Sequence, residues 1–317
     1  MTAGAVATAR STLEQLVAGG VEPATARARL AAGVAVAVAA AEGVRLPRLR
    51  LLEAWGEPVA AALAPGEVAA GRPAAVYEAL LDPGGRRRRG AFYTPAAVAG
   101  AVAGWALELV ADPRPVVADP AAGGGAFLLA AAEQLAAGGL DRAEVVRHLL
   151  VGVDVDPVAA AVTEAVLALW CRGAAVPRVV VGDALCLGAA AWPERPHVVV
   201  GNPPFLSQLA RSTARCTSEV EVLRARFGPA VTAYVDTAVL FLALAVELVR
   251  PGGAVALVLP ESFLASRDAG PARRSVLAGA GLRALWVPAA PVFDSAAVRV
   301  CVPVLARGPG GGGVVQV

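Results

Sequence analysis

The chain has 317 residues, of which 57% are apolar, and its formal net charge is only +2. This length is sufficient for one α/β domain and a smaller accessory region, and so small a net charge gives no strong field that would attract a polyanion. The four cysteines are far apart, form no CxxC pair and are accompanied by only two histidines. This pattern disfavours a zinc site and a disulfide framework, so we expect no metal.

The mean hydropathy of +0.61 raises the question of a membrane span. The longest apolar runs, Ala31–Ala41 and Ala238–Val249, are shorter than the roughly 20 residues that a span requires, and the second contains Glu247. No charged-then-apolar segment with a cleavage site opens the chain. The sequence therefore predicts a cytoplasmic protein with no membrane segment.

Residues 1–85 are predicted to form a helical N-terminal region. Ser11-Thr-Leu-Glu14 has the spacing of a capping box, which indicates a helix start, and Gly19-Gly20 ends that helix. Pro23 begins a second helix that runs to about Gly43. Two more helices are expected near Pro58 and Pro73, the last over Ala74–Leu81. The basic run Arg86–Arg89 that follows is either a solvated patch or a contact to nucleic-acid phosphates.

From Pro115 onward, short β-branched runs alternate with longer segments rich in Ala and Leu, a pattern typical of βαβ units and a parallel sheet. The last two strands have no helix between them and can pair antiparallel, which predicts a seven-stranded, Rossmann-like, doubly wound sheet. The expected strands are Val116–Ala118, Leu150–Val153, Val179–Val181, Val198–Val200, Ala254–Leu259, Leu282–Val287 and Val298–Leu305. The expected helices are Ala126–Ala137, Pro157–Trp170, Ala233–Val249 and Pro271–Ala280.

The most informative motif, Asn202-Pro203-Pro204-Phe205, directly follows the apolar run Val198–Val200. Two prolines exclude a continuing helix or central strand, so the motif is a rigid turn at the carboxyl end of a strand. There it offers an amide oxygen, a fixed carbonyl and an aromatic face. These groups can bind the hydrogens of a planar exocyclic amine and stack on the attached ring. His197, at the start of the same strand, is interpreted as a structural histidine.

Three acidic residues follow successive predicted strands, and a glycine turn follows the first of them. Asp119 precedes Gly123–Gly125, Asp154 ends the second strand, and Asp183 follows the third. Ligands bind at this edge of an open α/β sheet. A dinucleotide fingerprint would need glycine where Leu128 stands, and no P-loop lysine follows. Each acid alone could be a helix cap, but the ordered set suits the ammonium, ribose and adenine of S-adenosylmethionine.

Together with Tyr93-Thr94-Pro95, these motifs resemble the gamma group of DNA adenine-N6 amino-methyltransferases, the N-6 DNA methylases of restriction-modification and phage-defence systems. The resemblance covers about residues 75 to 306 and begins in a helix that ends in Val76-Tyr-Glu-Ala-Leu-Leu81. It implies an S-adenosylmethionine-dependent methyltransferase fold. The implied activity is site-specific methylation of the N6 amine of a flipped adenine in double-stranded DNA.

The resemblance also assigns roles to individual positions. The implied cofactor-binding residues are Tyr93, Thr94, Pro95, Asp119, Ala121, Gly123, Gly125, Phe127, Asp154, Asp183, Ala184 and Asn202. The implied catalytic residues are Asn202, Pro203, Pro204 and Phe205, and the residues implied to stack on the base are Phe205 and Phe293, the latter being equally well interpreted as a core residue. The family's glycine loop usually has Cys where Ala122 stands and Ser where Gly124 stands.

The predicted domains are the helical region 1–85, a catalytic domain over 86–306 and a glycine-rich linker over 307–317. Members of this group normally continue into a target-recognition domain. We therefore expect a fragment, a catalytic core or a subunit whose DNA reader is a separate polypeptide. Residues Ser207–Arg226 are read either as a mobile loop that faces DNA or as a plain exposed connection.

Two alternative functions stay open. A methyltransferase acting on protein glutamine or ribosomal guanine shares Asn202-Pro203-Pro204-Phe205 but lacks the Tyr93-Thr94-Pro95 segment. A cofactor-binding, non-catalytic or truncated subunit of a modification complex is the other alternative.

Overall fold

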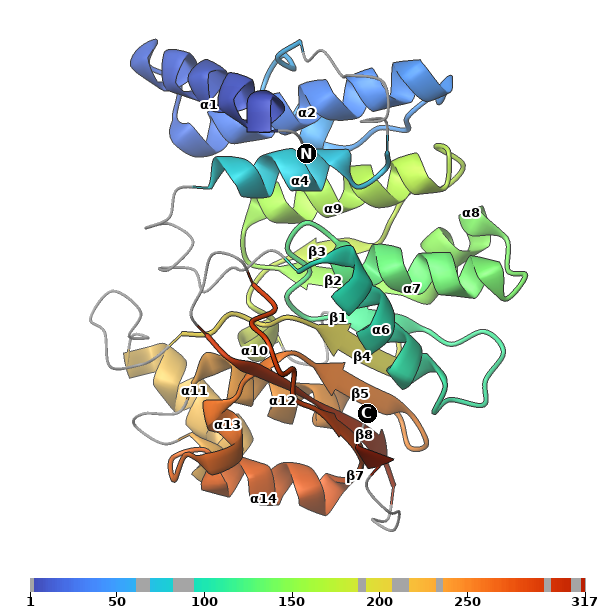
Figure 1. Cartoon of the computed structure of the whole chain (residues 1–317), viewed down its shortest axis with the longest axis vertical. Coiled ribbons are helices and arrows are strands. Elements are labelled where there is room, and N and C mark those ends of the chain that lie inside the picture. Colours follow the sequence, from blue (N-terminus) through green and yellow to red (C-terminus); the bar gives the residue numbers. More distant parts are fainter. Residues whose placement is uncertain are drawn as a thin grey trace. The chain divides into compact units, whose positions relative to one another are not determined.

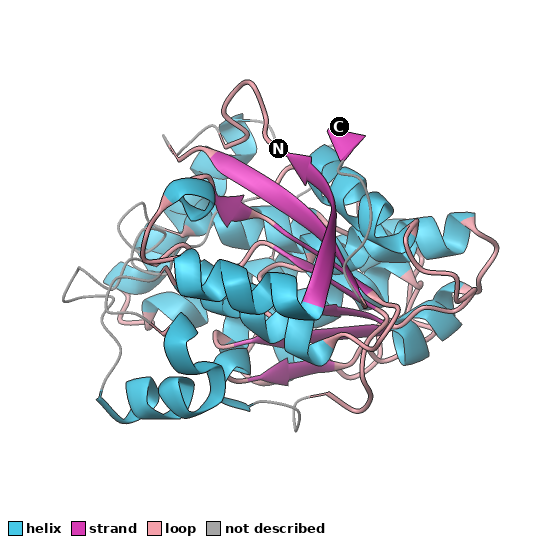
Figure 2. Cartoon of the chain, turned by 90° about the horizontal axis from the view of Figure 1, so that it is seen from below, coloured by secondary structure: helices cyan, strands magenta, loops and turns pink. Residues whose placement is uncertain are grey.

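The computed structural model describes residues 3–60, 69–81, 94–187, 192–206, 217–231, 236–293, 298–308 and 315–316. The chain divides into two compact units, each built from two segments of sequence. The first unit comprises residues 1–83 and 122–182, and the second comprises residues 84–121 and 183–317. Helices and strands occur in both units (Figure 1; Figure 2, strands in magenta).

The first unit is mostly helical around one parallel strand pair. β2 and β3 pair in the register Gly152↔Val179, so that Asp154 lies opposite Val181. The helices α2, α4 and α9 pack on one another, and their facing sides are buried Ala, Val and Leu (Figure 1). The elements are α1 (Ala3–Ala18), α2 (Pro23–Glu42), α3 (Arg50–Glu53), α4 (Arg72–Leu80), α7 (Ala126–Ala137), α8 (Arg142–Glu144), the π-helix η1 (Val145–Leu149), β2 (Leu150–Asp154), α9 (Pro157–Trp170) and β3 (Val179–Val181).

The second unit contains a mixed sheet in the order β1-β4-β5-β8-β7-β9. β1, β4 and β5 are parallel, whereas β8 runs antiparallel to both β5 and β7. The elements are α6 (Ala96–Leu107), β1 (Val117–Asp119), α10 (Ala184–Leu187), β4 (Val198–Gly201), α11 (Thr217–Phe227), the 3-10 helix η3 (Gly228–Ala230), α12 (Thr237–Leu248), β5 (Ala254–Leu257), β6 (Leu259–Pro260), α13 (Ser262–Ala265), α14 (Gly270–Gly279), β7 (Ala280–Trp286), β8 (Val300–Arg307) and β9 (Val315–Gln316).

The structure confirms the predicted α/β class and the antiparallel pairing of the last two predicted strands, β7 and β8. All seven predicted strands are present, but the predicted strand Ala254–Leu259 is divided into β5 and β6. With β9, the described residues therefore contain nine strands instead of seven. α7 and α9 have the predicted bounds. The predicted helix from Pro23 is also correct, because Gly43 ends it in the left-handed conformation at φ 62°. The predicted helix near Pro58 and the basic run Arg86–Arg89 lie largely or wholly outside the described residues.

Five local predictions were wrong or incomplete. The capping box at Ser11 is wrong because α1 already begins at Ala3, and the Thr12 hydroxyl donates to the carbonyl of Thr8 inside the helix. α6 was missed because its 12 residues include no charged side chain, so no polar face marks a helical period. The short α3 was also missed. In the segment read as a loop or connection, α11 forms a helix, and β9 lies within the predicted linker.

One helix of the described chain is long and apolar enough to cross a membrane, namely α2, with 20 residues and a mean hydropathy of 1.4. Its uninterrupted apolar run, Ala31–Ala41, is shorter than the helix because Arg27 and Arg29 lie in its first two turns. About 61% of the helix's most apolar window is buried inside the structure. α2 is therefore accounted for as a core helix of the first unit.

Candidate functional site

In the first unit, the backbone of the glycine turn between β1 and α7 is held by hydrogen bonds to β2 and α9. Gly123 and Gly125 have φ values of 54° and 87°, which L side chains rarely adopt. Ala122 N donates to the carbonyl of Val153 over 2.9 Å, and the carbonyl of Gly123 accepts from Thr163 Oγ1 over 2.7 Å. A Cβ atom on Gly123 would meet no atom within 4 Å. The turn therefore has open space beside its backbone at this position.

Asp154, predicted to bind the ribose, is hydrogen-bonded to this turn. Its Oδ2 accepts from Gly123 N over 2.7 Å, and its Oδ1 accepts from Asp156 N over 2.8 Å. Each carboxylate oxygen has a second lone pair, so the group keeps acceptor capacity for hydroxyls. The structure thus brings together Gly123 and Asp154, which lie 31 residues apart in sequence.

Gly124 marks a close contact of the turn with helix α4. A Cβ on Gly124 would lie 2.7 Å from Ala74 Cβ and 2.9 Å from Glu78 Oε1. Both distances are shorter than real Cβ contacts, so the departure from the family's usual serine matches the approach of α4. Phe127, predicted to pack near the cofactor, is 3% exposed on α7.

In the second unit, Asp119 and the turn after β4 approach each other closely. Asp119 is 1% exposed and its Oδ1 accepts from Ala121 N over 2.9 Å. A Cβ on Gly201 would lie 2.6 Å from that same oxygen. Gly201 is therefore required directly before Asn202, and this requirement was not predicted from the sequence. The sequence feature that could have indicated it is the glycine at the end of the strand β4, directly before the Asn202-Pro203-Pro204-Phe205 motif.

Asn202 contacts the described part of the Tyr93-Thr94-Pro95 segment. Asn202 Nδ2 donates to Thr94 Oγ1 over 3.1 Å, and Thr94 is 5% exposed. The two residues are 108 positions apart. Pro95 stands at the N-terminus of α6, whereas Tyr93 lies outside the described residues. The structure therefore joins two of the predicted motifs through one side-chain pair.

The remaining predicted residues of the second unit occupy turns and core positions. Asp183 Oδ1 accepts from Leu185 N over 2.9 Å at the start of α10, so the helix-cap alternative correctly describes its local contact. Ala184, beside it, is 1% exposed. Phe205 is partly exposed, whereas Phe293 is 4% exposed, as expected of a core phenylalanine. Pro203 is buried and Pro204 is partly exposed.

The turn after Phe205 is tied to the start of α12. The carbonyl of Leu206 accepts from Thr237 N over 3.2 Å and from Thr237 Oγ1 over 3.3 Å. Asp236 caps α12 by accepting from Ala238 N over 2.9 Å. Burial raises the pKa of Asp236, and the backbone N–H groups of Ala238 and Leu206 oppose this rise.

His197 has the hydrogen bonds of a structural residue, as predicted. Its Nδ1 accepts from Val116 N over 2.9 Å, and its Nε2 lies 2.8 Å from Asp112 Oδ2. The backbone N–H of Arg114 holds the pKa of Asp112 below its usual range, and His197 adds to this effect. Among the residues that the structure describes, no group of three or more His, Cys, Asp or Glu side chains could hold a metal ion.

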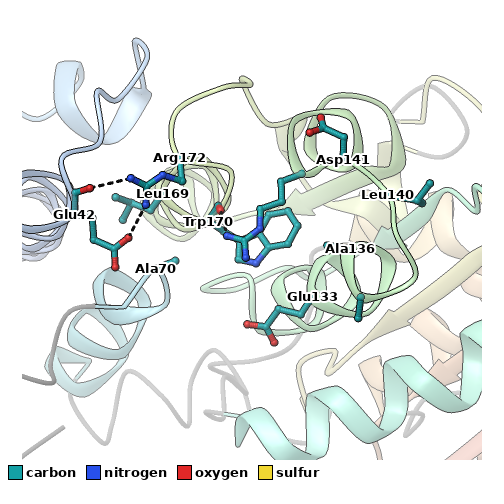
Figure 3. A pocket seen from close by; sticks show the side chains of 11 residues that line it. Glu42, Ala70, Glu133, Ala136, Leu140, Asp141, Leu169, Trp170 and Arg172 are labelled. Carbon is teal, nitrogen blue, oxygen red and sulfur yellow. Dashed lines mark hydrogen bonds and ion pairs between the residues drawn. The ribbon is translucent and has the colours of Figure 1, made fainter.

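The first unit also contains a cavity of about 710 Å³ that none of the predicted site residues line. In Figure 3, Arg172 bonds to the carbonyl and carboxylate of Glu42, at 3.0 and 3.4 Å. The Arg142 guanidinium lies 5.0 Å from the centre of the Trp170 ring. Both arginines of the cavity therefore already have partners, and the cavity stays outside the candidate site.

Three solved structures illustrate what the chain resembles, and no curated protein sequence matches it. The first is a candidate class I S-adenosylmethionine-dependent methyltransferase from Listeria monocytogenes, with 14% identity, TM-score 0.65, and coverage of 98% of this chain and 90% of that protein. The second is a modification subunit of a candidate type I restriction enzyme from Vibrio vulnificus, with 23% identity, TM-score 0.57, and coverage of 75% of this chain and 49% of that one. The third is DrdV in complex with DNA, with 19% identity, TM-score 0.63, and coverage of 80% and 30%.

These likenesses confirm the predicted fold class. The chain spans half or less of the length of the second and third proteins. A family model described as N-6 DNA methylase matches residues 74–313, which is most of the chain and includes both motifs joined by Thr94 and Asn202. The chain therefore belongs to the N-6 DNA methylase family.

Proposed function

We propose that the protein methylates the N6 amine of an adenine flipped out of double-stranded DNA, with S-adenosylmethionine as the methyl donor. Its family and its resemblance to restriction-modification proteins support a role as a DNA methyltransferase of the restriction-modification type. The observation that carries the proposal is the hydrogen bond from Asn202 Nδ2 to Thr94 Oγ1. It joins the amine-binding motif to the segment that distinguishes adenine-N6 enzymes from the glutamine and ribosomal alternative.

The described residues fit S-adenosylmethionine. In the first unit, the open space beside Gly123 lets a ligand approach the backbone, and Asp154 can accept from ribose hydroxyls. In the second unit, Asp119 is a buried carboxylate suited to the amino-acid part, and Asp183 is suited to the adenine. Ala121, Gly125, Phe127, Ala184, Thr94 and Pro95 belong to the same proposed set. When bound, this cofactor supplies an electrophilic methyl group.

The amine of adenine is a poor nucleophile because its lone pair is delocalised into the ring. An amide that donates through Nδ2 to Thr94 presents Oδ1 on its other side, and this oxygen is buried. A hydrogen bond formed there has little competition from water. With the Pro203 carbonyl as the second acceptor, the two amine hydrogens are drawn out of the ring plane and the lone pair localises on nitrogen. This mechanism needs no obligatory general base.

Extrusion of the base from the duplex costs a few kcal/mol, and stacking on Phe205 would offset part of that cost. Double-stranded DNA is thus the proposed substrate, and the cytoplasm is the proposed location of the protein. A separate target-recognition polypeptide is proposed as the source of sequence specificity, because a modification subunit is among the similar structures.

The test is transfer of a tritiated methyl group to unmethylated double-stranded DNA, followed by identification of the labelled nucleoside. We expect N6-methyladenine from the wild type and a loss of at least about 100-fold in Asn202→Ala, with cofactor affinity within a few-fold. Arg48→Ala, at a side chain that is 93% exposed in the first unit, serves as the control. Label in ribosomal RNA or protein glutamine, or an Asn202→Ala variant of near wild-type rate, would refute the proposal.

A further inference from the structure

Helix α4, in the N-terminal helical region, contacts the glycine turn within the first unit. The 2.7 Å and 2.9 Å approaches to a Cβ on Gly124 come from Ala74 and Glu78 of this helix. Tyr77 lies between these two residues in sequence and is 3% exposed. α4 is thus packed against the turn, and its polar side chains can affect the position of the turn.

A continuous series of hydrogen bonds leads from Tyr77 to that turn. Tyr77 OH donates to Asp156 Oδ2 over 2.8 Å, across 79 positions of sequence. The other carboxylate oxygen of Asp156 accepts from Val158 N over 2.9 Å and caps α9. Asp156 N then donates to Asp154 Oδ1 over 2.8 Å, and Asp154 Oδ2 accepts from Gly123 N over 2.7 Å.

Each bond in this series restrains the next group. Asp156 is partly exposed, so its carboxylate has access to water. The phenol fixes the second oxygen and with it the peptide that donates to Asp154. The orientation of Asp154 decides where two ribose hydroxyls would find acceptors, because hydrogen bonds weaken steeply with angle.

We propose that Tyr77 is a positioning residue for the cofactor, acting through Asp156 on the ribose-binding carboxylate of Asp154. The inference rests on the proposed function. It makes α4 part of the cofactor-binding machinery and predicts that removal of one hydroxyl, to which the sequence analysis gave no role, weakens recognition of the ribose.

The experiment measures calorimetric affinity for S-adenosylhomocysteine and for its 2′-deoxyribose analogue. Tyr77→Phe keeps the ring and its packing. We expect about five- to twenty-fold weaker binding of S-adenosylhomocysteine and a smaller ratio between the two affinities. In an Asp154→Ala background, Tyr77→Phe should change binding less than about two-fold, because the effect passes through that carboxylate.

Asp141→Asn is the matched control, since Asp141 caps α8 in the same unit through Glu144 N at 3.0 Å but belongs to no part of the series. Its affinities should equal those of the wild type. A Tyr77→Phe variant with unchanged affinity ratio, or with the same loss in the Asp154→Ala background, overturns the inference alone. A wild type that binds neither nucleoside overturns the proposed function as well.

Discussion

Gly201→Ala is the sharpest perturbation of the second unit. The added Cβ would lie 2.6 Å from Asp119 Oδ1 and 3.2 Å from its Cγ. An ordinary contact begins near 3.4 Å, so the carboxylate must retreat by about 0.8 Å. Asp119 is 1% exposed and cannot turn toward water, and the retreat would stretch its 2.9 Å bond from Ala121 N. Overpacking and loss of this charge-assisted bond together should lower the free energy of unfolding by about 2–4 kcal/mol.

Urea unfolding followed by circular dichroism measures this change, with cofactor binding as a second readout. Gly100→Ala is the matched control, since a Cβ at this position of α6 meets nothing within 4 Å and alanine favours a helix by up to about 1 kcal/mol. Adding Asp119→Ala to Gly201→Ala should cost less than the sum of the two single changes. A Gly201→Ala protein within about 0.5 kcal/mol of the wild type would contradict the geometry.

The other predictions concern packing, a partly buried ion pair and a partly buried acid. Gly124→Ala should lower the free energy of unfolding by about 1–3 kcal/mol in thermal or urea unfolding, because the Cβ meets Ala74 at 2.7 Å; an unchanged midpoint would contradict this contact. Glu164→Gln should cost about 2 kcal/mol in the same assay, because Glu164 is 8% exposed and bonds to Arg50 through both oxygens, whereas equal stability would show a pair without net value. Burial raises the pKa of Asp236 above its ordinary 3.8, so its contribution to stability is full below that pH and is lost as pH rises through the folded-state pKa. Asp236→Asn should remove this loss of stability with rising pH while keeping the hydrogen bond from Ala238 N. The measurement is the free energy of unfolding against pH, and a curve parallel to that of the wild type would refute the prediction.

The local motifs were predictable because the backbone conformation of each turn depends on residues that are adjacent in sequence. Two prolines after an apolar run determine a turn at Asn202, and glycines of positive φ determine the turn before α7. Strand and helix alternation gave the fold class for the same reason. α6 escaped this reasoning because a helix built from apolar residues and glycine alone has no polar side to reveal its period.

The pairs that join these motifs came only from tertiary structure. The sequence placed Thr94 and Asn202 in separate motifs, and packing of the second unit brought them to 3.1 Å. The requirement for glycine at position 201 depends on a carboxylate 82 residues earlier, and Tyr77 is linked to Asp154 and Gly123 through Asp156. Sequence determines the chemistry and local geometry of each turn, whereas long-range contacts depend on how helices and strands pack, which no local pattern encodes.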